Sequence, residues 1–278
     1  MHSLLMTVML MGLATAVCLG QAATAATSRF AVSSVKPSAP DSQGASFELL
    51  PGGRVRATGH SVRSLVRVAW GSPDFRLNEF EVLGGPAWVD SERFDVSGVS
   101  NTGPINVTAE ETLTMLQSLI RERFRLQLRQ ETRIGSILAL TLDRKDRRLG
   151  GRMQPSQLTC PSPDARGGGG VSAQTDPACE IRPGLESSVL SLAVRGQPMA
   201  YWARYFTRIL RRPVIDETEL SGTFDVQLTF SVADASDRRT VQTSLDDALR
   251  DQLGLKLVAR QGPATVFVID GVERPTRD

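Results

Sequence analysis

Hydrophobic and polar residues follow the same order in two blocks of this chain. Residues 53–143 and residues 190–270 each contain short alternating stretches interleaved with stretches whose apolar residues recur at helical spacing. Alternation is typical of half-buried strands, and a spacing of three to four residues is typical of amphipathic helices. The pattern predicts an α+β fold of two tandem, pseudo-equivalent units, each running strand, helix, strand, helix and final hairpin.

The first helix of each unit is predicted from an apolar face that follows a helix-starting residue. Ser61 is of a type favoured as an N-cap, and Pro198 suits a first helical turn because its missing N–H is not needed there. The two apolar faces match without a gap. They are Val62, Leu65, Val66 and Ala69 in the first unit, and Met199, Trp202, Ala203 and Phe206 in the second.

A second helix in each unit leads directly into an alternating strand. Thr108 and Glu111 have the spacing of a capping box, which predicts where this helix starts in the first unit. An apolar strand then closes each unit, so that two consecutive strands are expected to pair as a hairpin. The strands of these hairpins are residues 124–128 and 137–143 in the first unit, and 253–257 and 264–270 in the second.

The N-terminus is typical of a signal peptide. An apolar run from Leu4 to Leu19 is followed by small residues at Ala23 and Ala25. No later segment is apolar for long enough to span a membrane, so we expect an exported protein, periplasmic or extracellular. The predicted divisions are a signal peptide at 1–25, a first α+β repeat at 26–148, a Gly/Pro-rich linker at 149–187 and a second α+β repeat at 188–278.

The linker contains two of the three cysteines. Cys160 and Cys179 bracket a run rich in Gly and Pro, which has no apolar core of its own. Because an exported protein folds in an oxidising compartment, we predict a disulfide between them. Closing a loop of this length stabilises the fold by about 3 kcal/mol. Metal binding is the alternative, but two cysteines without nearby histidines are a poor zinc site.

Composition and charge are those of an ordinary folded protein, with 41% apolar residues, 22% charged residues and a net charge of +2. This charge is too small to indicate a nucleic-acid partner. The basic residues comprise 29 Arg and 3 Lys. A coding bias explains such an excess, and anion recognition is the alternative.

The sequence offers few candidates for catalysis. His60 is the only histidine beyond the predicted signal peptide, so a Ser-His-Asp triad would depend on it alone. Asp95 and Asp225 form a candidate carboxylate pair because each follows a Phe in a corresponding strand. The alternative is that these carboxylates are solvated or cap a turn. We therefore predict no catalytic, cofactor-binding or metal-binding residue.

Four residues are candidates for contact with a ligand or a protein partner. Trp88 ends an insertion of the first unit, residues 71–88, that has the composition of a loop, and loops often carry function. Packing at the edge of a core is the alternative for Trp88. Arg204, Arg208 and Arg211 lie on the polar side and at the end of the first helix of the second unit.

Four ordered motifs resemble a large exported family of soil bacteria, known chiefly as a soil-associated domain of unknown function. The motifs are residues 30–38, 85–96, 115–124 and 268–275. The resemblance implies an extracytoplasmic protein with no established activity, often present in many paralogues. Similar domains occur attached to antirepressor-type membrane metallopeptidases, which implies a sensory or binding role. The family provides no catalytic residues that could be assigned here.

These observations favour a non-enzymatic module of the cell envelope that binds a small ligand or an envelope protein without a cofactor. One alternative is a hydrolase that uses carboxylates. Another is an assembly or sensory component with a fixed protein partner.

Overall fold

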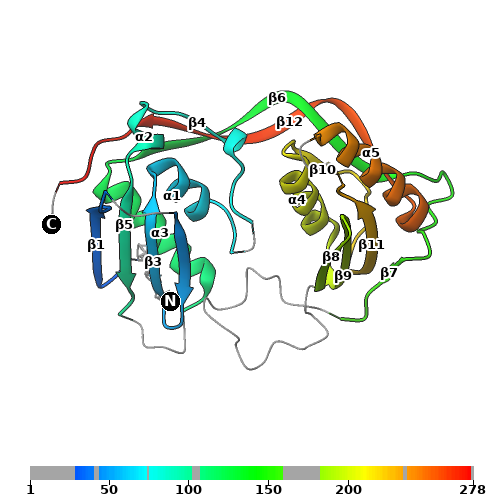
Figure 1. Ribbon diagram of the computed structural model, residues 1–278, viewed down its shortest axis with the longest axis horizontal. Coiled ribbons are helices and arrows are strands. Elements are labelled where there is room, and N and C mark those ends of the chain that lie inside the picture. Colours follow the sequence, from blue (N-terminus) through cyan, green and yellow to red (C-terminus); the bar gives the residue numbers. More distant parts are fainter. Residues whose placement is uncertain are drawn as a thin grey trace, which may run out of the picture.

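A computed structural model of the chain consists of two lobes joined by a long two-stranded ribbon (Figure 1). It describes residues 29–40, 44–73, 75–101, 107–158, 182–233 and 237–276. Each lobe has a four-stranded antiparallel sheet and two main helices. Mixed helices and sheets of this kind confirm the predicted α+β class.

The first lobe is built on a sheet with the strand order β1-β5-β3-β2. Its strands are β1 (Val32–Pro37), β2 (Ser46–Leu50), β3 (Arg54–His60) and β5 (Phe94–Val99). Its helices are α1 (Val62–Ala69), the single-turn α2 (Trp88–Ser91) and α3 (Ala109–Arg123). The apolar faces of α1 and α3 pack with the sheet into one core.

The second lobe is built on a sheet with the strand order β7-β11-β9-β8. Its strands are β7 (Met153–Pro155), β8 (Arg182–Glu186), β9 (Val189–Gln197) and β11 (Phe224–Ser231). Its helices are α4 (Met199–Leu210) and α5 (Arg238–Ala248), which continues as a π-helical turn, η4 (Leu249–Leu253). A second core lies between these helices and their sheet.

The predicted starts of the helices are confirmed. The side chain of Ser61 accepts a hydrogen bond from the Ser64 N–H at the start of α1, and Pro198 is the N-cap of α4. Thr108 and Glu111 form both hydrogen bonds of a capping box. These features are local in sequence, which is why the pattern alone was sufficient to predict them.

The predicted final hairpins do not form. The two strands expected in each hairpin are instead one continuous strand, β6 (Gln127–Leu142) in the first half of the chain and β12 (Leu255–Gly271) in the second. β6 and β12 pair antiparallel along nearly their whole length. They cross both lobes along the top of the molecule in Figure 1. Two short strands, β4 (Val82–Gly84) and β10 (Val214–Asp216), complete this third sheet by parallel pairing.

The first of the two expected hairpins lacks a turn signal, whereas in the second the dipeptide Gly262-Pro263, typical of a turn, lies within the extended strand. Residues 129–136 contain one glycine, Gly135, with no adjacent Asn or Asp to favour a tight hairpin turn. Gly135 instead lies directly opposite Gly262 at the centre of the ribbon. Each strand begins on one lobe and ends on the other, and thereby provides each core with the apolar residues that a local hairpin would have provided.

The two cores consequently do not follow the predicted division of the chain. Leu138 and Leu140, from the range predicted as the first repeat, pack in the core of the second lobe. Ile269, from the range predicted as the second repeat, packs in the core of the first lobe. The range predicted as a linker, 149–187, contains β7 and β8, which form the two edges of the second sheet. Their shortness and polar flanks hid them in the pattern.

The insertion of the first lobe makes another connection between the lobes. Phe75, which lies in this insertion, is buried in the core of the second lobe. Leu77, two residues later, is buried in the core of the first. A short 3-10 turn, η1 (Glu79–Glu81), then leads into β4. The insertion therefore runs between the lobes and contacts both of them.

Candidate functional site: the pocket between the lobes

A pocket of about 430 Å³ lies between the two lobes. The first lobe contributes the end of α1, the insertion and η1, the second lobe contributes the start of α4, and the ribbon contributes β12. The lining residues are Trp70, Gly71, Ser72, Phe75, Leu77, Glu81, Gln197, Pro198, Ala200, Tyr201, Arg204, Thr265 and Phe267. Ligand pockets commonly occur at such boundaries between structural units and in this range of volume.

A tight turn after α1 directs the insertion toward the second lobe. The backbone N–H of Ser72 donates to the carbonyl of Phe75 at 2.8 Å, and the Phe75 N–H donates to the Ser72 carbonyl at 3.2 Å. Gly71 is required before this turn, since a Cβ there would lie 2.4 Å from the Phe75 carbonyl oxygen. The turn thus places the Phe75 ring 5.0 Å from the ring of Tyr201, centroid to centroid.

An ion pair crosses the pocket from one lobe to the other. Arg204 Nη1 donates to Glu81 Oε1. The other carboxylate oxygen, Oε2, accepts from the backbone N–H of Asn78 at 2.5 Å and from its side-chain Nδ2 at 2.7 Å. The side chain of Glu81 is only 10% exposed. The three donors hold this carboxylate in one orientation and use both of its oxygens.

Gln197 is the most unusual polar residue of the pocket lining. It is the last residue of β9 and only 1% exposed. Its Nε2 is buried and has no hydrogen-bond partner in the described part of the chain. A buried donor without a partner costs about 1–3 kcal/mol. Such a group lining a pocket is a candidate for recognition of a ligand acceptor.

Positive charge gathers at the same boundary. Partial burial lowers the pKa of Arg76, as do the nearby guanidiniums of Arg67 and Arg208. Arg67 comes from α1, Arg76 from the insertion and Arg208 from α4, so both lobes contribute. Arg67 pairs with Glu79 at 3.6 Å, and its Nε donates to the Leu77 carbonyl.

The three arginines predicted as contacts lie in different places in the structure. Arg204 lines the pocket and is paired with Glu81. Arg208 lies one turn further along α4 and is exposed. Arg211 is the C-cap of α4, also exposed, with a left-handed backbone (φ 49°). Of the three, only Arg204 lies in the pocket.

Trp88 lies outside the pocket. It is half-buried at the start of α2 and packs against the core of the first lobe. The guanidinium of Arg274 lies 4.9 Å from the centre of its ring. Arg274 Nη2 also donates to Glu92 at 2.7 Å, which fixes the guanidinium over the ring. One face of Trp88, a predicted contact for a ligand or a partner, is thus covered by a side chain of the protein itself.

The paired carboxylates have a structural role in each lobe. Asp95 Oδ1 accepts from the backbone N–H of Gly59 at 2.9 Å and from the hydroxyl of Ser38 at 2.6 Å. Asp225 Oδ1 accepts from the Gly196 N–H at 3.0 Å. Burial raises the pKa of Asp225, but hydrogen bonds from Ser156, Gly196 and Arg195 outweigh it and lower the pKa below its ordinary value.

The two glycines explain why this contact occurs twice. Gly59 and Gly196 both have left-handed backbones, with φ of 69° and 64°. Each lies at an irregularity in the pairing of its strand with β5 or β11. At each bulge the glycine N–H donates to the side-chain carboxylate of a residue on the partner strand. Asp95 and Asp225 therefore match the turn-capping alternative rather than a catalytic pair.

His60 is buried, and its lowered pKa favours the neutral ring. Its Nε2 lies 3.0 Å from the carbonyl oxygen of Ser46, which can only accept, so Nε2 carries the proton. Nδ1 therefore accepts from the hydroxyl of Ser64 at 2.8 Å. Burial and the charge of Arg76 lower the pKa of His60, and the bond to Ser46 opposes them only in part. No described carboxylate contacts the ring, so the orienting acid of a triad is not provided by the described residues.

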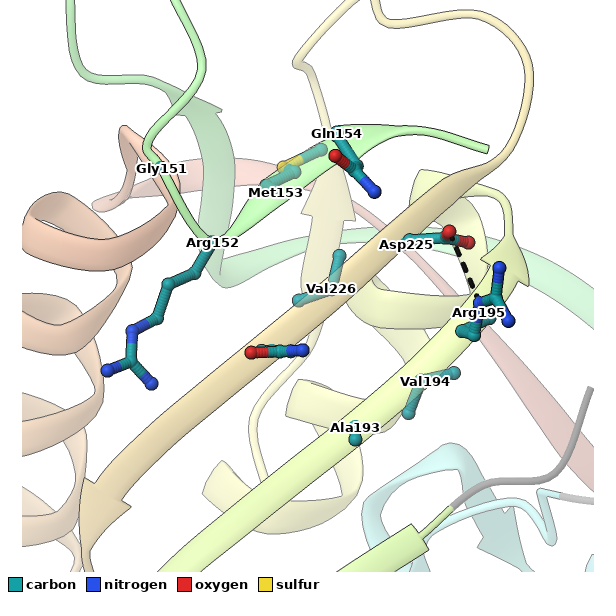
Figure 2. A pocket seen from close by; sticks show the side chains of 10 residues that line it. Gly151, Arg152, Met153, Gln154, Ala193, Val194, Arg195, Asp225 and Val226 are labelled. Atoms are coloured by element: carbon teal, nitrogen blue, oxygen red, sulfur yellow. Dashed lines mark hydrogen bonds and ion pairs between the residues drawn. The ribbon is translucent and has the colours of Figure 1, made fainter. Parts of the chain in front are cut away.

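A second hollow of about 430 Å³ lies on the sheet of the second lobe, where β7, β9 and β11 meet (Figure 2). Its polar side chains include Arg152, Gln154 and Arg195. Figure 2 shows Arg195 joined to Asp225, at 3.3 Å between Nε and Oδ2, while Arg152 points away from that pair. Among the described residues that line this hollow, no buried polar side-chain atom lacks a partner, and one lobe alone forms it. We therefore regard the pocket between the lobes as the better candidate.

Three further predictions concern the disulfide, metal binding and membrane spans. Cys160 and Cys179 lie outside the described residues. Within the described ranges, three or more His, Cys, Asp or Glu side chains nowhere gather in a way that could hold a metal ion. No helix in those ranges is long and apolar enough to cross a membrane.

The sequence alone did not identify Gln197 or Glu81 as site residues. A weak signal was present at Gln197, because it occupies the position after the bulge glycine that His60 occupies in the first lobe. His60 has protein partners for both ring nitrogens, whereas Gln197 has none for Nε2 among the described residues. The sequence records only part of this difference: Ser64, four residues after His60, corresponds to Tyr201 in the second lobe, whereas the other partner, Ser46, comes from a separate strand.

Comparison with known proteins identifies a family but no characterised relative. No curated protein and no solved structure matches the chain significantly. Residues 63–272 match a family described as "Protein of unknown function (DUF3738)". That match extends from α1 to the end of β12 and therefore includes the second lobe, the ribbon, the pocket lining and the helices and β5 of the first lobe, whereas β1, β2 and β3 precede it. The chain belongs to this family of unknown function.

Proposed function

We propose that this protein is a non-enzymatic binding module of the cell envelope, and that its ligand site is the pocket between the lobes. Export is supported by the signal-like sequence of residues 1–25. The disulfide predicted between Cys160 and Cys179 would suit the same compartment. The resemblance to soil-associated exported proteins agrees with this location.

A duplication of one α+β unit would explain why a site exists at this boundary. It is supported by the common strand order of the two sheets and by the matching glycine–carboxylate contacts at Asp95 and Asp225. Two similar lobes with exchanged strands enclose a space to which both contribute. The insertion of residues 71–88 then adds side chains that only the first lobe has.

The observation that supports the proposal most strongly is the buried Gln197 Nε2 at the pocket lining. A protein that only needed a stable contact between its lobes would gain by placing an apolar side chain there. Tyr201 is held in an aromatic cluster, with Phe75 at 5.0 Å and Trp202 at 5.9 Å between ring centroids. This rigid wall would lose little conformational entropy when a ligand binds.

Ligand-observed NMR with a fragment library tests the proposal. Ala200 lines the pocket and is exposed, so Ala200→Trp would fill the pocket without altering a core. Ala193 is likewise exposed and lines the hollow of Figure 2, which makes Ala193→Trp the matched control. We expect fragment binding that Ala200→Trp abolishes and Ala193→Trp leaves unchanged.

Two results would contradict the proposal. Loss of binding in Ala193→Trp alone would show that the fragments bind in the hollow on the sheet of the second lobe. An absence of binding by any fragment, or binding that neither substitution changes, would remove the pocket between the lobes as the site.

A further inference from the structure

Two residues of the pocket lining have donors available to a ligand. Gln197 Nε2 has no partner among the described residues. Arg204 has five N–H donors, of which one donates to Glu81. Glu81 already accepts three hydrogen bonds, so it has little capacity left for a ligand. A ligand that complements these groups must be rich in acceptors.

Arginine side chains from both lobes lie at the boundary between the lobes, and among them Arg204 lines the pocket. Among the described residues, Arg67, Arg76, Arg204 and Arg208 bring four guanidiniums to this boundary, and Glu79 and Glu81 bring two carboxylates. Arg76 and Arg208 have no carboxylate partner in the described ranges. Because Arg76 and Arg208 lie outside the pocket lining, they act on a ligand only at longer range, where cations attract an anion and raise its association rate.

The rest of the lining fits a flat apolar body. Trp70, Tyr201 and Phe267 all line the pocket. The indole of Trp70 is held by the guanidinium of Arg121, which lies 4.9 Å from the ring centre. Aromatic walls favour offset or edge contacts with another ring. A volume of about 430 Å³ has room for a small ring system with one or two substituents.

From these observations we infer that the pocket between the lobes binds a small organic carboxylate with a flat, apolar body. The inference rests on the proposed function and adds to it the chemical class of the ligand. In this arrangement the apolar body contacts Tyr201 and Phe267, and Gln197 Nε2 donates to an acceptor of the ligand. The free N–H groups of Arg204 donate to its carboxylate.

A matched pair of probes tests the class. 2-Naphthoate and 2-naphthamide have the same ring system and a carbonyl acceptor, and they differ in charge. We expect 2-naphthoate to bind at least about tenfold more tightly in isothermal titration calorimetry. This difference should shrink when the ionic strength is raised from about 0.05 M to about 0.3 M. Acetate and inorganic phosphate lack the apolar body and should bind more weakly than either probe.

Substitutions test which residues produce the preference for the carboxylate. The double variant Glu81→Gln with Arg204→Gln removes both charges and retains neutral side chains that can hydrogen-bond, and should reduce the preference for the carboxylate to about twofold or less. Gln197→Leu should weaken both probes, because each uses the amide donor. Arg195→Gln, in the hollow of Figure 2, is the control that should leave both affinities unchanged.

Failure of the inferred ligand class can be distinguished from failure of the proposed binding site. Equal affinity for the two probes would overturn the inferred ligand class while leaving the pocket as a binding site. The inferred class is also overturned, and the pocket retained, if neither probe binds but other fragments do so and are lost in Ala200→Trp. If no fragment binds at the pocket, the proposed function fails, and the inferred class with it.

Discussion

The ring of Phe75, from the insertion of the first lobe, packs 5.0 Å from the ring of Tyr201 on α4 of the second lobe, centroid to centroid. Phe75 is only 7% exposed and belongs to the core of the second lobe. The insertion therefore connects the lobes by side-chain packing, in addition to the backbone pairing of β6 with β12. It also forms one wall of the pocket.

Replacing Phe75 should lower the stability of the protein, although this residue lies outside helices and strands. Phe75→Ala removes a buried ring, and we expect it to lower the free energy of unfolding by about 3 kcal/mol. Urea denaturation followed by tryptophan fluorescence measures this change. Phe75→Leu, which retains most of the apolar volume, should cost less than half as much. A change below about 0.5 kcal/mol for Phe75→Ala would show that the contact contributes little.

The ion pair between Glu81 and Arg204 should show a measurable coupling. The Glu81 side chain is 10% exposed and the Arg204 side chain 33% exposed, so the pair is more buried than an ordinary surface salt bridge. In a double-mutant cycle with Glu81→Gln and Arg204→Gln, we expect a coupling energy of about 1–2 kcal/mol. The exposed pair of Arg147 with Glu219 is a suitable comparison. Equal coupling in both pairs would argue against a special role for the pair in the pocket.

Asp95 should be important for stability. Asp95→Ala would leave the Gly59 N–H without its acceptor and should lower the free energy of unfolding by about 1–3 kcal/mol. Asp95→Asn retains one acceptor oxygen and should cost less. Chemical denaturation measures both, and the binding of fragments at the pocket should be unchanged. Loss of binding with unchanged stability would instead assign Asp95 a direct role in the site.

His60 should make stability depend on pH. Its pKa is lowered in the folded state, so the unfolded chain binds more protons than the folded chain below about pH 6.5. The contribution of His60 to stability is thus fully present above that pH and is lost as the pH falls toward the folded-state pKa. The measurement is the free energy of unfolding in urea at about pH 7.5 and about pH 5. His60→Gln, which copies the residue at position 197, should reduce the difference between the two. An identical pH dependence in both proteins would contradict this assignment.

Replacing Gln197 with an apolar residue should stabilise the protein. Gln197→Leu removes a buried donor that has no partner among the described residues, and we expect stability to rise by about 1 kcal/mol. For a chain of this size, the melting temperature would rise by about 2–4 °C. Thr141→Val is the matched control, because the Thr141 hydroxyl is also buried without a partner in the described part of the chain but lies outside the pocket. Both variants should melt higher, and only Gln197→Leu should lose binding. A fall in stability with Gln197→Leu would mean that the amide already has a structural role.

Much of the fold could be predicted because its determinants are local. The N-cap at Ser61, the capping box at Thr108 and the apolar faces of α1 and α4 all depend on residues within a few positions of each other. The candidate site was much harder to predict. Arg204 was among the predicted contacts, but its partner Glu81 is 123 positions away in the sequence. Trp88 was a reasonable candidate from its loop-like surroundings, but Arg274, from the far end of the chain, lies over its ring.

The sequence by itself determined the main helices and several of the strands, because hydrophobic periodicity and end signals act over a few residues. Only the tertiary structure decided which strands pair. A local hairpin and the exchanged ribbon of β6 and β12 would bury the same apolar residues, so the pattern cannot distinguish them. The pocket depends on this choice, since it exists only where the two lobes, the insertion and β12 meet. Its most informative atom, Gln197 Nε2, is defined by the lack of a partner among the described residues, which no sequence pattern records.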